Sequence, residues 1–176
     1  MIKKTPKTIL ETERLTLRQL SPDDAELILE LLNEPSFLQN IGDRGVRTLE
    51  DARQYILDGP AASYARFGFG LYRVALKETD VPIGMCGLLK RDSLEDVDIG
   101  FAFFPRFWSK GYAVESASAV MTYGREVLGL DRIVAVTAPD NEASIRVLGK
   151  LGLKFAGMVK LAGYDTESRL FTPDGL

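Results

Sequence analysis

Residues 97–119 read VDIGFAFFPRFWSKGYAVESASA and combine a strand, a turn and the start of a helix. Apolar side chains occupy every second position from Val97 to Phe103, which is typical of a strand with one buried face. Pro105 ends this strand because proline offers no N–H to a sheet. Beyond the turn, apolar or small residues recur at spacings of three and four, which predicts a helix. These residues are Val114, Ala117, Met121, Gly124 and Leu128.

The turn from Trp108 to Ala113 has the features of an anion site. The first N–H groups of a helix have no partner inside the helix, and the helix dipole adds partial positive charge there. Small residues at Gly111 and Ala113 allow a phosphate to approach this backbone, and Lys110 adds a full charge. Neither a P-loop nor a dinucleotide-binding glycine pattern is present. The alternative is an ordinary turn in which Trp108 only packs.

The composition is that of a globular protein. The chain has 176 residues, of which 45% are hydrophobic and 27% charged, so we expect a single domain over residues 1–176. A formal net charge of −3 argues against a nucleic-acid partner and against binding to anionic membranes. No apolar run approaches the roughly 20 residues of a membrane span, and residues 1–6 lead into no apolar signal-peptide core. We therefore expect a cytoplasmic protein.

The chain contains one cysteine and no histidine. These counts exclude a disulfide within the chain, a thiolate metal cluster, Ser-His-Asp hydrolysis and histidine-bound zinc. Cys86 lies in a stretch that reads as a buried strand, and no histidine is present to activate it, so we interpret it as a core residue. Any chemistry must use carboxylates, hydroxyls, water or backbone groups, and no metal is expected.

Turn residues and periodicity predict the remaining elements. A helix is expected from Ser21 until Pro35 stops it, and a second from Thr48 until Gly59 and Pro60 stop it. The other predicted segments are a loop over 33–47, helices over 111–129 and 141–151, and strands over 14–18, 69–77, 82–90, 97–104, 132–137, 153–160 and 166–171.

The pattern Trp108-x-x-Gly111-x-Ala113 resembles a known family. Entered from a strand that ends at Pro105, it is similar to the acetyl-CoA pyrophosphate loop of the GNAT acetyltransferase superfamily. The family loop usually opens with Gln or Arg. Trp in that place is similar to the branch that includes the ribosomal-protein N-terminal (alanine/serine) acetyltransferases.

Two further segments extend the resemblance, which covers about residues 11–171. Residues 140–153 (DNEASIRVLGKLGL) are similar to the family's Asn-x-x-Ser/Ala helix and its Lys-x-Gly-Phe ending, and residues 12–18 (TERLTLR) to the opening strand of that branch. The resemblance implies an α+β fold with a mixed, mostly antiparallel sheet of six to seven strands and helices on both faces. It also implies a gap where the strands at 97–104 and 132–137 splay apart to admit the cofactor.

The resemblance implies acetyl-CoA as the acetyl donor and assigns residues to it. The backbone from Phe101 to Phe103 would pair with pantetheine and donate to the thioester oxygen, while both rings pack in the core. Asn141 caps a helix, and its amide would contact the cofactor together with Ser144. The pyrophosphate would be held by the backbone of Trp108, Ser109, Lys110, Gly111, Tyr112 and Ala113.

A general base and a general acid are harder to assign. Asp98 lies on the strand before the expected gap, where the family often has a carboxylate, and is the candidate base; the alternative is a structural or solvated carboxylate. Many members carry a Tyr in the second helix as general acid, but the aligned residue here is Leu148. Tyr164 is a distant candidate for that role. We interpret Glu115, just after the turn, as a brace for the turn.

The choice of acceptor follows from the energy needed to neutralise an amine. A lysine-type amine with a pKa of about 10.4 costs about 5 kcal/mol to neutralise at pH 7, whereas an α-amine with a pKa of about 8 costs about 1 kcal/mol. A site without a strong base therefore suits a protein or peptide α-amine, which attacks the thioester directly in a ternary complex because no nucleophile is visible.

Other acceptors and a second class of protein stay open. A small amine such as a polyamine, an aminoglycoside or an amino acid is one alternative, and a non-catalytic acyl-CoA-binding protein is another. The acceptor is expected beside residues 33–47 and the carboxyl-terminal strands. An exposed last strand would permit a homodimer.

Overall fold

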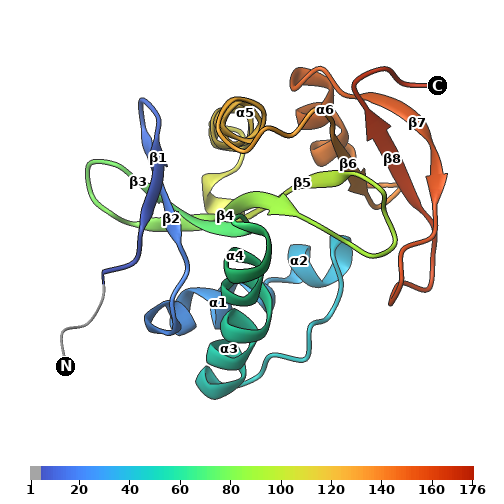
Figure 1. Ribbon diagram of the computed structural model, residues 1–176. Helices are drawn as coiled ribbons and strands as arrows, with labels where there is room; N and C mark the ends of the chain where they lie inside the picture. Colours follow the sequence, from blue (N-terminus) through green and yellow to red (C-terminus); the bar gives the residue numbers. More distant parts are fainter. Residues whose placement is uncertain (1–4) are drawn as a thin grey trace.

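The chain folds around one eight-stranded sheet (Figure 1). This computed structural model describes residues 5–176; residues 1–4, on which part of the signal-peptide expectation falls, lie outside that range. The strands lie in the order β1-β2-β3-β4-β5-β6-β8-β7, and only β5 and β6 are parallel among these neighbours. Their bounds are Thr8–Glu11 (β1), Leu15–Gln19 (β2), Leu71–Leu76 (β3), Pro82–Leu89 (β4), Val97–Phe103 (β5), Ile133–Thr137 (β6), Lys154–Val159 (β7) and Ser168–Thr172 (β8).

The mixed, mostly antiparallel sheet that the resemblance implied is confirmed, but it has eight strands rather than six or seven. The missed strand is β1, which pairs with β2 in a hairpin. Its four residues place Ile9 and Leu10 side by side, so the strand is too short to show the alternation by which strands are recognised.

The last strand in sequence is not the edge of the sheet. β8 pairs with β6 on one side and with β7 on the other. The β7–β8 hairpin folds back so that β8 occupies the place beside β6, and β7 forms the edge. The expectation that the last strand is an exposed edge, which was the ground for a homodimer, is therefore wrong.

β5 and β6 are paired only at their beginnings. The register joins Val97 to Ile133 and Asp98 to Val134, and no further pair follows although β5 continues to Phe103. Beyond this second pair the two strands splay apart, as the resemblance predicted. The free edge of β5 consequently borders a gap in the sheet.

Helices cover both faces of the sheet, as expected (Figure 1). On one face α5 contributes Ala117 and Met121 to the core, and Gly124 lets this helix approach Ile133 closely. On the other face the core is built around α1 and α3. The helix bounds are Ala25–Leu32 (α1), Pro35–Asn40 (α2), Leu49–Ile56 (α3), Ala62–Phe67 (α4), Tyr112–Glu126 (α5) and Glu142–Lys150 (α6).

Two helices were not expected from the sequence. α2 lies inside the predicted loop over 33–47, because Pro35 occupies the first turn of a new helix as well as following α1. The expected stop at Gly59 and Pro60 is wrong. The chain continues through a π-helical turn, Leu57–Ala61, into α4, and this wider turn accommodates Pro60, which has no N–H to donate.

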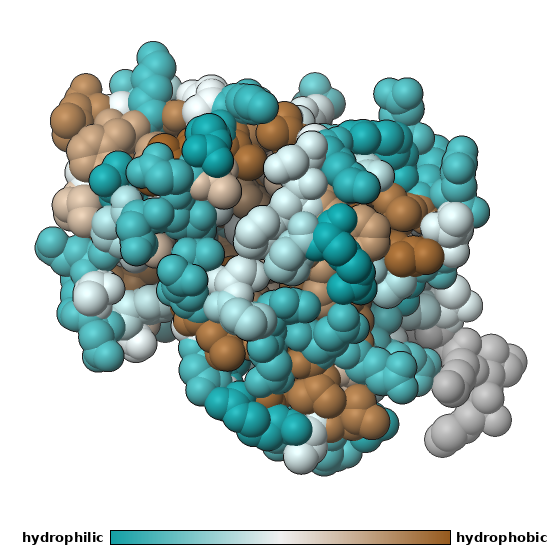
Figure 2. Space-filling view, turned by 180° about the vertical axis from the view of Figure 1, so that it is seen from behind, coloured by the Kyte–Doolittle hydropathy of each residue, from teal (hydrophilic) through white to brown (hydrophobic). Residues whose placement is uncertain are grey.

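No helix within residues 5–176 is long and apolar enough to cross a membrane. On the face seen from behind, apolar side chains form several separate patches among polar and charged ones (Figure 2). Hydrophilic side chains thus interrupt the apolar surface of this face.

Candidate active site

Two cavities adjoin the gap between β5 and β6. The turn cavity, of about 710 Å³, lies beside the turn that begins α5. The Asp98 cavity, of about 780 Å³, lies beside Asp98 and the β7–β8 connection. Both are lined by parts of β5, by α2 and by the start of α6, so they meet at a common wall. The shared residues are Phe37, Asn40, Ile41, Phe101, Ala102, Asn141 and Ser144.

The turn before α5 has an unusual backbone. A 3₁₀ turn, Pro105–Phe107, follows β5, and α5 begins at Tyr112, so the predicted order of strand, turn and helix is confirmed. Ser109 has a φ of 60° and Gly111 a φ of 84°, both in the left-handed region that residues with side chains disfavour. A left-handed serine stores strain, and such strain concentrates at ligand sites.

The backbone donors of this turn have no backbone acceptor within residues 5–176. Within the part of the chain that is described, the N–H groups of residues 109–114 find no backbone acceptor, whereas the N–H of Glu115 already donates to the carbonyl of Gly111 at 3.0 Å. Unpaired N–H groups and the helix dipole together create a positively polarised surface. Lys110 adds a full positive charge, so the turn suits an anion such as a diphosphate.

Trp108 anchors the turn to the end of β5. Its indole N–H donates to the carbonyl of Phe103 at 2.9 Å, while the residue keeps 46% of its surface exposed and lines the turn cavity. This bond uses the carbonyl of Phe103 and fixes the direction in which the chain leaves the strand. Trp108 therefore holds the turn by a hydrogen bond and also borders the cavity.

Phe101 and Phe103 belong to the core and to the cavity wall. Their ring centroids lie 6.4 Å apart, and both rings contact the core cluster that α5 covers. Both residues also line the turn cavity, on the part of β5 that has no β6 partner. The predicted packing role of the two rings is confirmed, and the strand edge beside them borders the gap.

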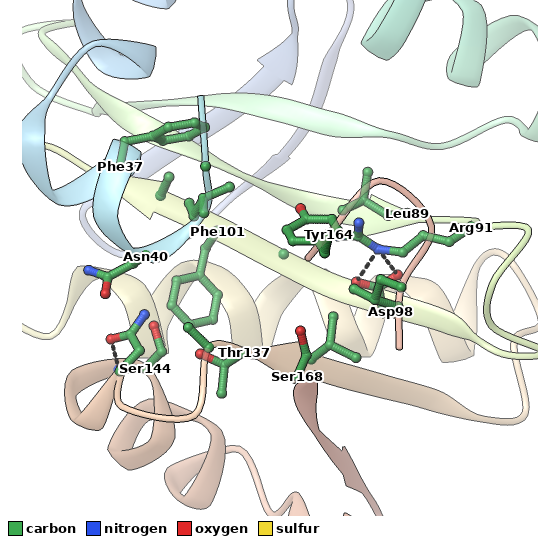
Figure 3. A pocket seen from close by; sticks show the side chains of 18 of the residues that line it. Phe37, Asn40, Leu89, Arg91, Asp98, Phe101, Thr137, Ser144, Tyr164 and Ser168 are labelled. Atoms are coloured by element: carbon green, nitrogen blue, oxygen red, sulfur yellow. Dashed lines mark hydrogen bonds and ion pairs between the residues drawn. The ribbon is translucent and has the colours of Figure 1, made fainter. Parts of the chain in front are cut away.

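The start of α6 contributes Asn141 and Ser144 to both cavities. The side-chain oxygen of Asn141 accepts a hydrogen bond from the N–H of Ser144 at 3.2 Å, which confirms the predicted helix cap. Ser144 and Phe101 face the same cavity in the close view (Figure 3). Side chains of α6 and the edge of β5 therefore face each other across the opened part of the sheet.

Asp98 lies on the floor of the Asp98 cavity (Figure 3). It is 1% exposed, and Nε of Arg91 donates to its Oδ1 at 3.0 Å and to its Oδ2 at 3.3 Å. Burial raises the pKa of Asp98 to about 6, although the positive charge of Arg91 acts in the opposite direction. The carboxyl group is therefore mostly ionised at pH 7 and mostly protonated at pH 5.

Two segments that are distant in sequence form the rim of the Asp98 cavity. Residues 37–44 come from α2 and the loop after it, and residues 161–168 come from the connection between β7 and β8. Nη2 of Arg44 donates to the hydroxyl of Tyr164 at 2.6 Å and so joins the two segments. Tyr164, the less favoured candidate for the general acid, thus lies on the same cavity as Asp98.

Several lining residues had no signal in the sequence. Because 33–47 was interpreted as a loop, the positions on α2 that face the cavities were not identified. Arg91 is seven residues from Asp98 along the chain and meets it only because β4 and β5 pair as an antiparallel hairpin. Phe37, Asn40 and Arg44 lie within residues 33–47, which were expected beside the acceptor, and the lining residues that the sequence did not indicate are Arg91 and Thr137.

Two apolar positions agree with their sequence-based interpretation. Leu148 is 2% exposed and lines the Asp98 cavity, so the helix position where many members of the resembled family carry Tyr is apolar here. Cys86 is fully buried, and burial raises the pKa of its thiol to about 12. A thiol with that pKa stays protonated at neutral pH, so the interpretation of Cys86 as a core residue is confirmed.

A mixed sheet that splays between β5 and β6, with helices on both faces, is the fold of the GNAT acetyltransferases. The family model for the acetyltransferase (GNAT) domain matches residues 14–154, and the chain belongs to this family. It is an acetyl-CoA-dependent N-acetyltransferase, and the resemblance to this family is confirmed.

Particular relatives and structures agree with this assignment. The chain is 35% identical over 159 residues to the uncharacterized N-acetyltransferase YoaA of Bacillus subtilis (strain 168), with 89% of each chain covered. A solved acetyltransferase from Agrobacterium tumefaciens str. C58 is 25% identical, with a TM-score of 0.77 and coverage of 98% of this chain and 96% of that one. RimL, a ribosomal L7/L12 alpha-N-protein acetyltransferase solved with coenzyme A, shares the fold at 18% identity, a TM-score of 0.80 and coverage of 94% and 97%.

Proposed function

We propose that this enzyme transfers an acetyl group from acetyl-CoA to the α-amine of a protein or peptide N-terminus, by direct attack in a ternary complex. The observation that carries the proposal is the junction of the two cavities at β5 and α6, with a carboxyl group of pKa about 6 in one and unpaired backbone donors beside the other. Acetyl-CoA supplies the activated acetyl group, and the protein supplies position, charge and a proton acceptor.

The turn before α5 fits the diphosphate of acetyl-CoA. The N–H groups of residues 109–114 lack backbone acceptors, and glycine at position 111 adopts the φ of 84° that the turn requires without steric cost. In the proposal the backbone of these residues holds the diphosphate, and the charge of Lys110, whose residue does not line the cavity, adds to the positive potential of the turn. Tyr112, Ala113 and Trp108 line the same cavity and bound the cofactor there.

The free edge of β5 fits the pantetheine arm. Pantetheine contains amides, which pair with an exposed strand edge as an added strand does. In the proposal the backbone from Phe101 to Phe103 pairs with the arm and donates to the thioester oxygen as negative charge develops on it. Asn141 and Ser144 contact the cofactor from the opposite wall.

Asp98 is the proposed general base. Moving a proton from an α-ammonium of pKa about 8 to a carboxylate of pKa about 6 costs about 3 kcal/mol, whereas moving it from a lysine ammonium of pKa about 10.4 costs about 6 kcal/mol. This difference favours an α-amine over a side-chain amine. The name of RimL, whose fold this chain shares, also supports an N-terminal acceptor.

A thiol-release assay with a panel of acceptors tests the proposal. The panel contains peptides with a free N-terminal Ser or Ala, the same peptides with a blocked N-terminus and one free lysine, a polyamine, an aminoglycoside and a free amino acid. We expect thiol release with the free N-termini and little with the others. Preference for a small amine would replace the proposed acceptor, and coenzyme A binding without thiol release from any amine would point to a non-catalytic protein.

A further inference from the structure

We propose that Arg14 and Glu115 position the turn before α5 and thereby set the affinity of the enzyme for acetyl-CoA. This inference rests on the proposed binding of the diphosphate at that turn. Neither residue lines the turn cavity or the Asp98 cavity, so neither is placed to touch the cofactor or the acceptor. They are positioning residues that act through the backbone.

The carboxylate of Glu115 accepts hydrogen bonds from the segment between β1 and β2. Its Oε1 accepts from the hydroxyl of Thr12 at 2.7 Å and from the N–H of Arg14 at 2.9 Å. Its Oε2 lies 2.7 Å from Nε and 2.7 Å from Nη2 of Arg14. Charge-assisted hydrogen bonds are stronger than neutral ones, so the guanidinium pair, together with the bond from the N–H of Arg14, places Arg14 against the first turn of α5.

The guanidinium of Arg14 then contacts three consecutive residues of the turn. Nη1 donates to the carbonyl of Lys110 at 3.0 Å, and the guanidinium carbon lies 4.4 Å from the ring centroid of Tyr112. A Cβ placed on Gly111 would lie 3.3 Å from Nη2. The backbone from Lys110 to Tyr112 thus lies against the guanidinium of Arg14.

The bond to Lys110 orients a proposed cofactor donor. The carbonyl of Lys110 and the N–H of Gly111 belong to one planar trans peptide unit, so they point in opposite directions. Because Arg14 binds the carbonyl on one side, the N–H is directed to the other side. Gly111 lines the turn cavity, and its N–H is among those without a backbone acceptor.

Arg14 also neutralises a carboxylate near the proposed anion site. Burial acts to raise the pKa of Glu115, but the hydrogen bonds from Thr12 and Arg14 outweigh it, and the pKa is lowered. Glu115 is therefore ionised in the first turn of α5, where a lone negative charge would oppose a bound diphosphate. Its pairing with Arg14 removes that opposition.

The first test compares Arg14→Met with Arg132→Met by calorimetric titration of coenzyme A. Arg132 is a matched control, because it is similarly exposed, pairs with Asp96 and Asp174 and lines neither cavity. We expect Arg14→Met to raise the Kd by about tenfold or more, and Arg132→Met to change it by less than about twofold. An unchanged Kd in a folded Arg14→Met variant overturns the inference. If that variant does not fold, Arg14→Lys replaces it, because lysine keeps the charge but lacks the fork that reaches Lys110.

The second test separates positioning from a general loss of structure. Acetyl-CoA is compared with S-acetyl-pantetheine, a donor without the diphosphate. Mass spectrometry measures the amount of acetylated peptide formed over several hours, which gives kcat/KM for each donor. We expect Arg14→Met to lower kcat/KM by about tenfold with acetyl-CoA and by less than about twofold with the truncated donor. Equal losses with both donors would indicate a merely structural role, and equal use of both donors by the unaltered enzyme would also overturn the inference. Failure of that enzyme to bind coenzyme A contradicts the proposed function itself.

Glu115→Gln separates positioning from charge. If Glu115 mattered only through its negative charge, its removal would strengthen coenzyme A binding. Positioning predicts weaker binding, because Arg14 loses its charged partner and is no longer held against Lys110 and Gly111. A lower Kd for Glu115→Gln than for the unaltered enzyme contradicts the inference.

Discussion

Nε of Arg91 lies 3.0 Å from Oδ1 of Asp98 on the floor of a cavity in which Asp98 is almost fully buried. Burial favours the neutral carboxyl group, and the neighbouring guanidinium favours the carboxylate. The outcome is a pKa of about 6, which leaves Asp98 ionised at pH 7 and still able to take up a proton. A fully exposed aspartate would be a much weaker base.

We expect Asp98→Asn to lower kcat by about 100-fold with an N-terminal peptide acceptor, because a positioned general base contributes about that much. The affinity for coenzyme A should stay within about twofold, since Asp98 does not line the turn cavity. Asp96→Asn is the control: Asp96 lies two residues away and pairs with Arg132 instead. Undiminished kcat in Asp98→Asn would assign Asp98 a structural role.

Asp98 should also change how stability depends on pH. Its pKa is about 6 in the folded chain and about 3.9 in the unfolded chain, so the folded protein binds the proton more tightly. This contribution is fully present below pH 4 and is lost as the pH rises through 6. The free energy of unfolding of the unaltered enzyme minus that of Asp98→Asn should therefore fall by about 2 kcal/mol between pH 4 and pH 7. Denaturant titrations at each pH measure this difference, and a difference that rises with pH would contradict the prediction.

Gly111→Val should weaken coenzyme A binding by about tenfold or more. Gly111 has a φ of 84°, and a β-branched side chain there would strain the backbone and press on Nη2 of Arg14, which lies 3.3 Å from the position of a Cβ. Gly129→Val is a matched control, because Gly129 has a φ of 70°, has open space around it and lines neither cavity. Both variants should lose similar stability in thermal unfolding. Equal coenzyme A affinity in the two variants would count against the turn as the diphosphate site.

Tyr164→Phe should weaken binding of the peptide acceptor and leave binding of acetyl-CoA unchanged. The hydroxyl of Tyr164 accepts from Arg44 and joins the two segments of the rim. Removing a hydrogen bond worth about 1 kcal/mol should raise KM for the peptide by about fivefold and leave KM for acetyl-CoA unchanged. Initial rates with each substrate varied in turn measure both constants. A larger change in KM for acetyl-CoA would place Tyr164 on the cofactor side.

The sequence predicted the part of the fold that shows strong local periodicity. β5 alternates over seven residues and α5 carries a regular buried stripe, and both lie where the pattern placed them. β1 was missed because four residues with adjacent apolar side chains show no period. The stop at Gly59 and Pro60 failed because a π-helical turn absorbs the proline, and no local rule signals such a turn.

For the site, too, the sequence predicted the local motifs but not the contacts between distant segments. The turn at residues 108–113 and the cap at Asn141 are local motifs, so the sequence identified them. The partners that decide their chemistry come from distant segments: Arg91 reaches Asp98 through strand pairing, Arg14 reaches Glu115 across 101 residues, and Arg44 reaches Tyr164 across 120. No spacing in one sequence records such contacts, because they depend on how the sheet brings its edges and loops together.

The most direct measurement is a crystal structure of the enzyme with coenzyme A bound. The account predicts that the diphosphate oxygens lie within hydrogen-bonding distance of backbone N–H groups among residues 109–114, with pantetheine along the free edge of β5. Density for the diphosphate at any other place, with this turn left uncontacted, would contradict it.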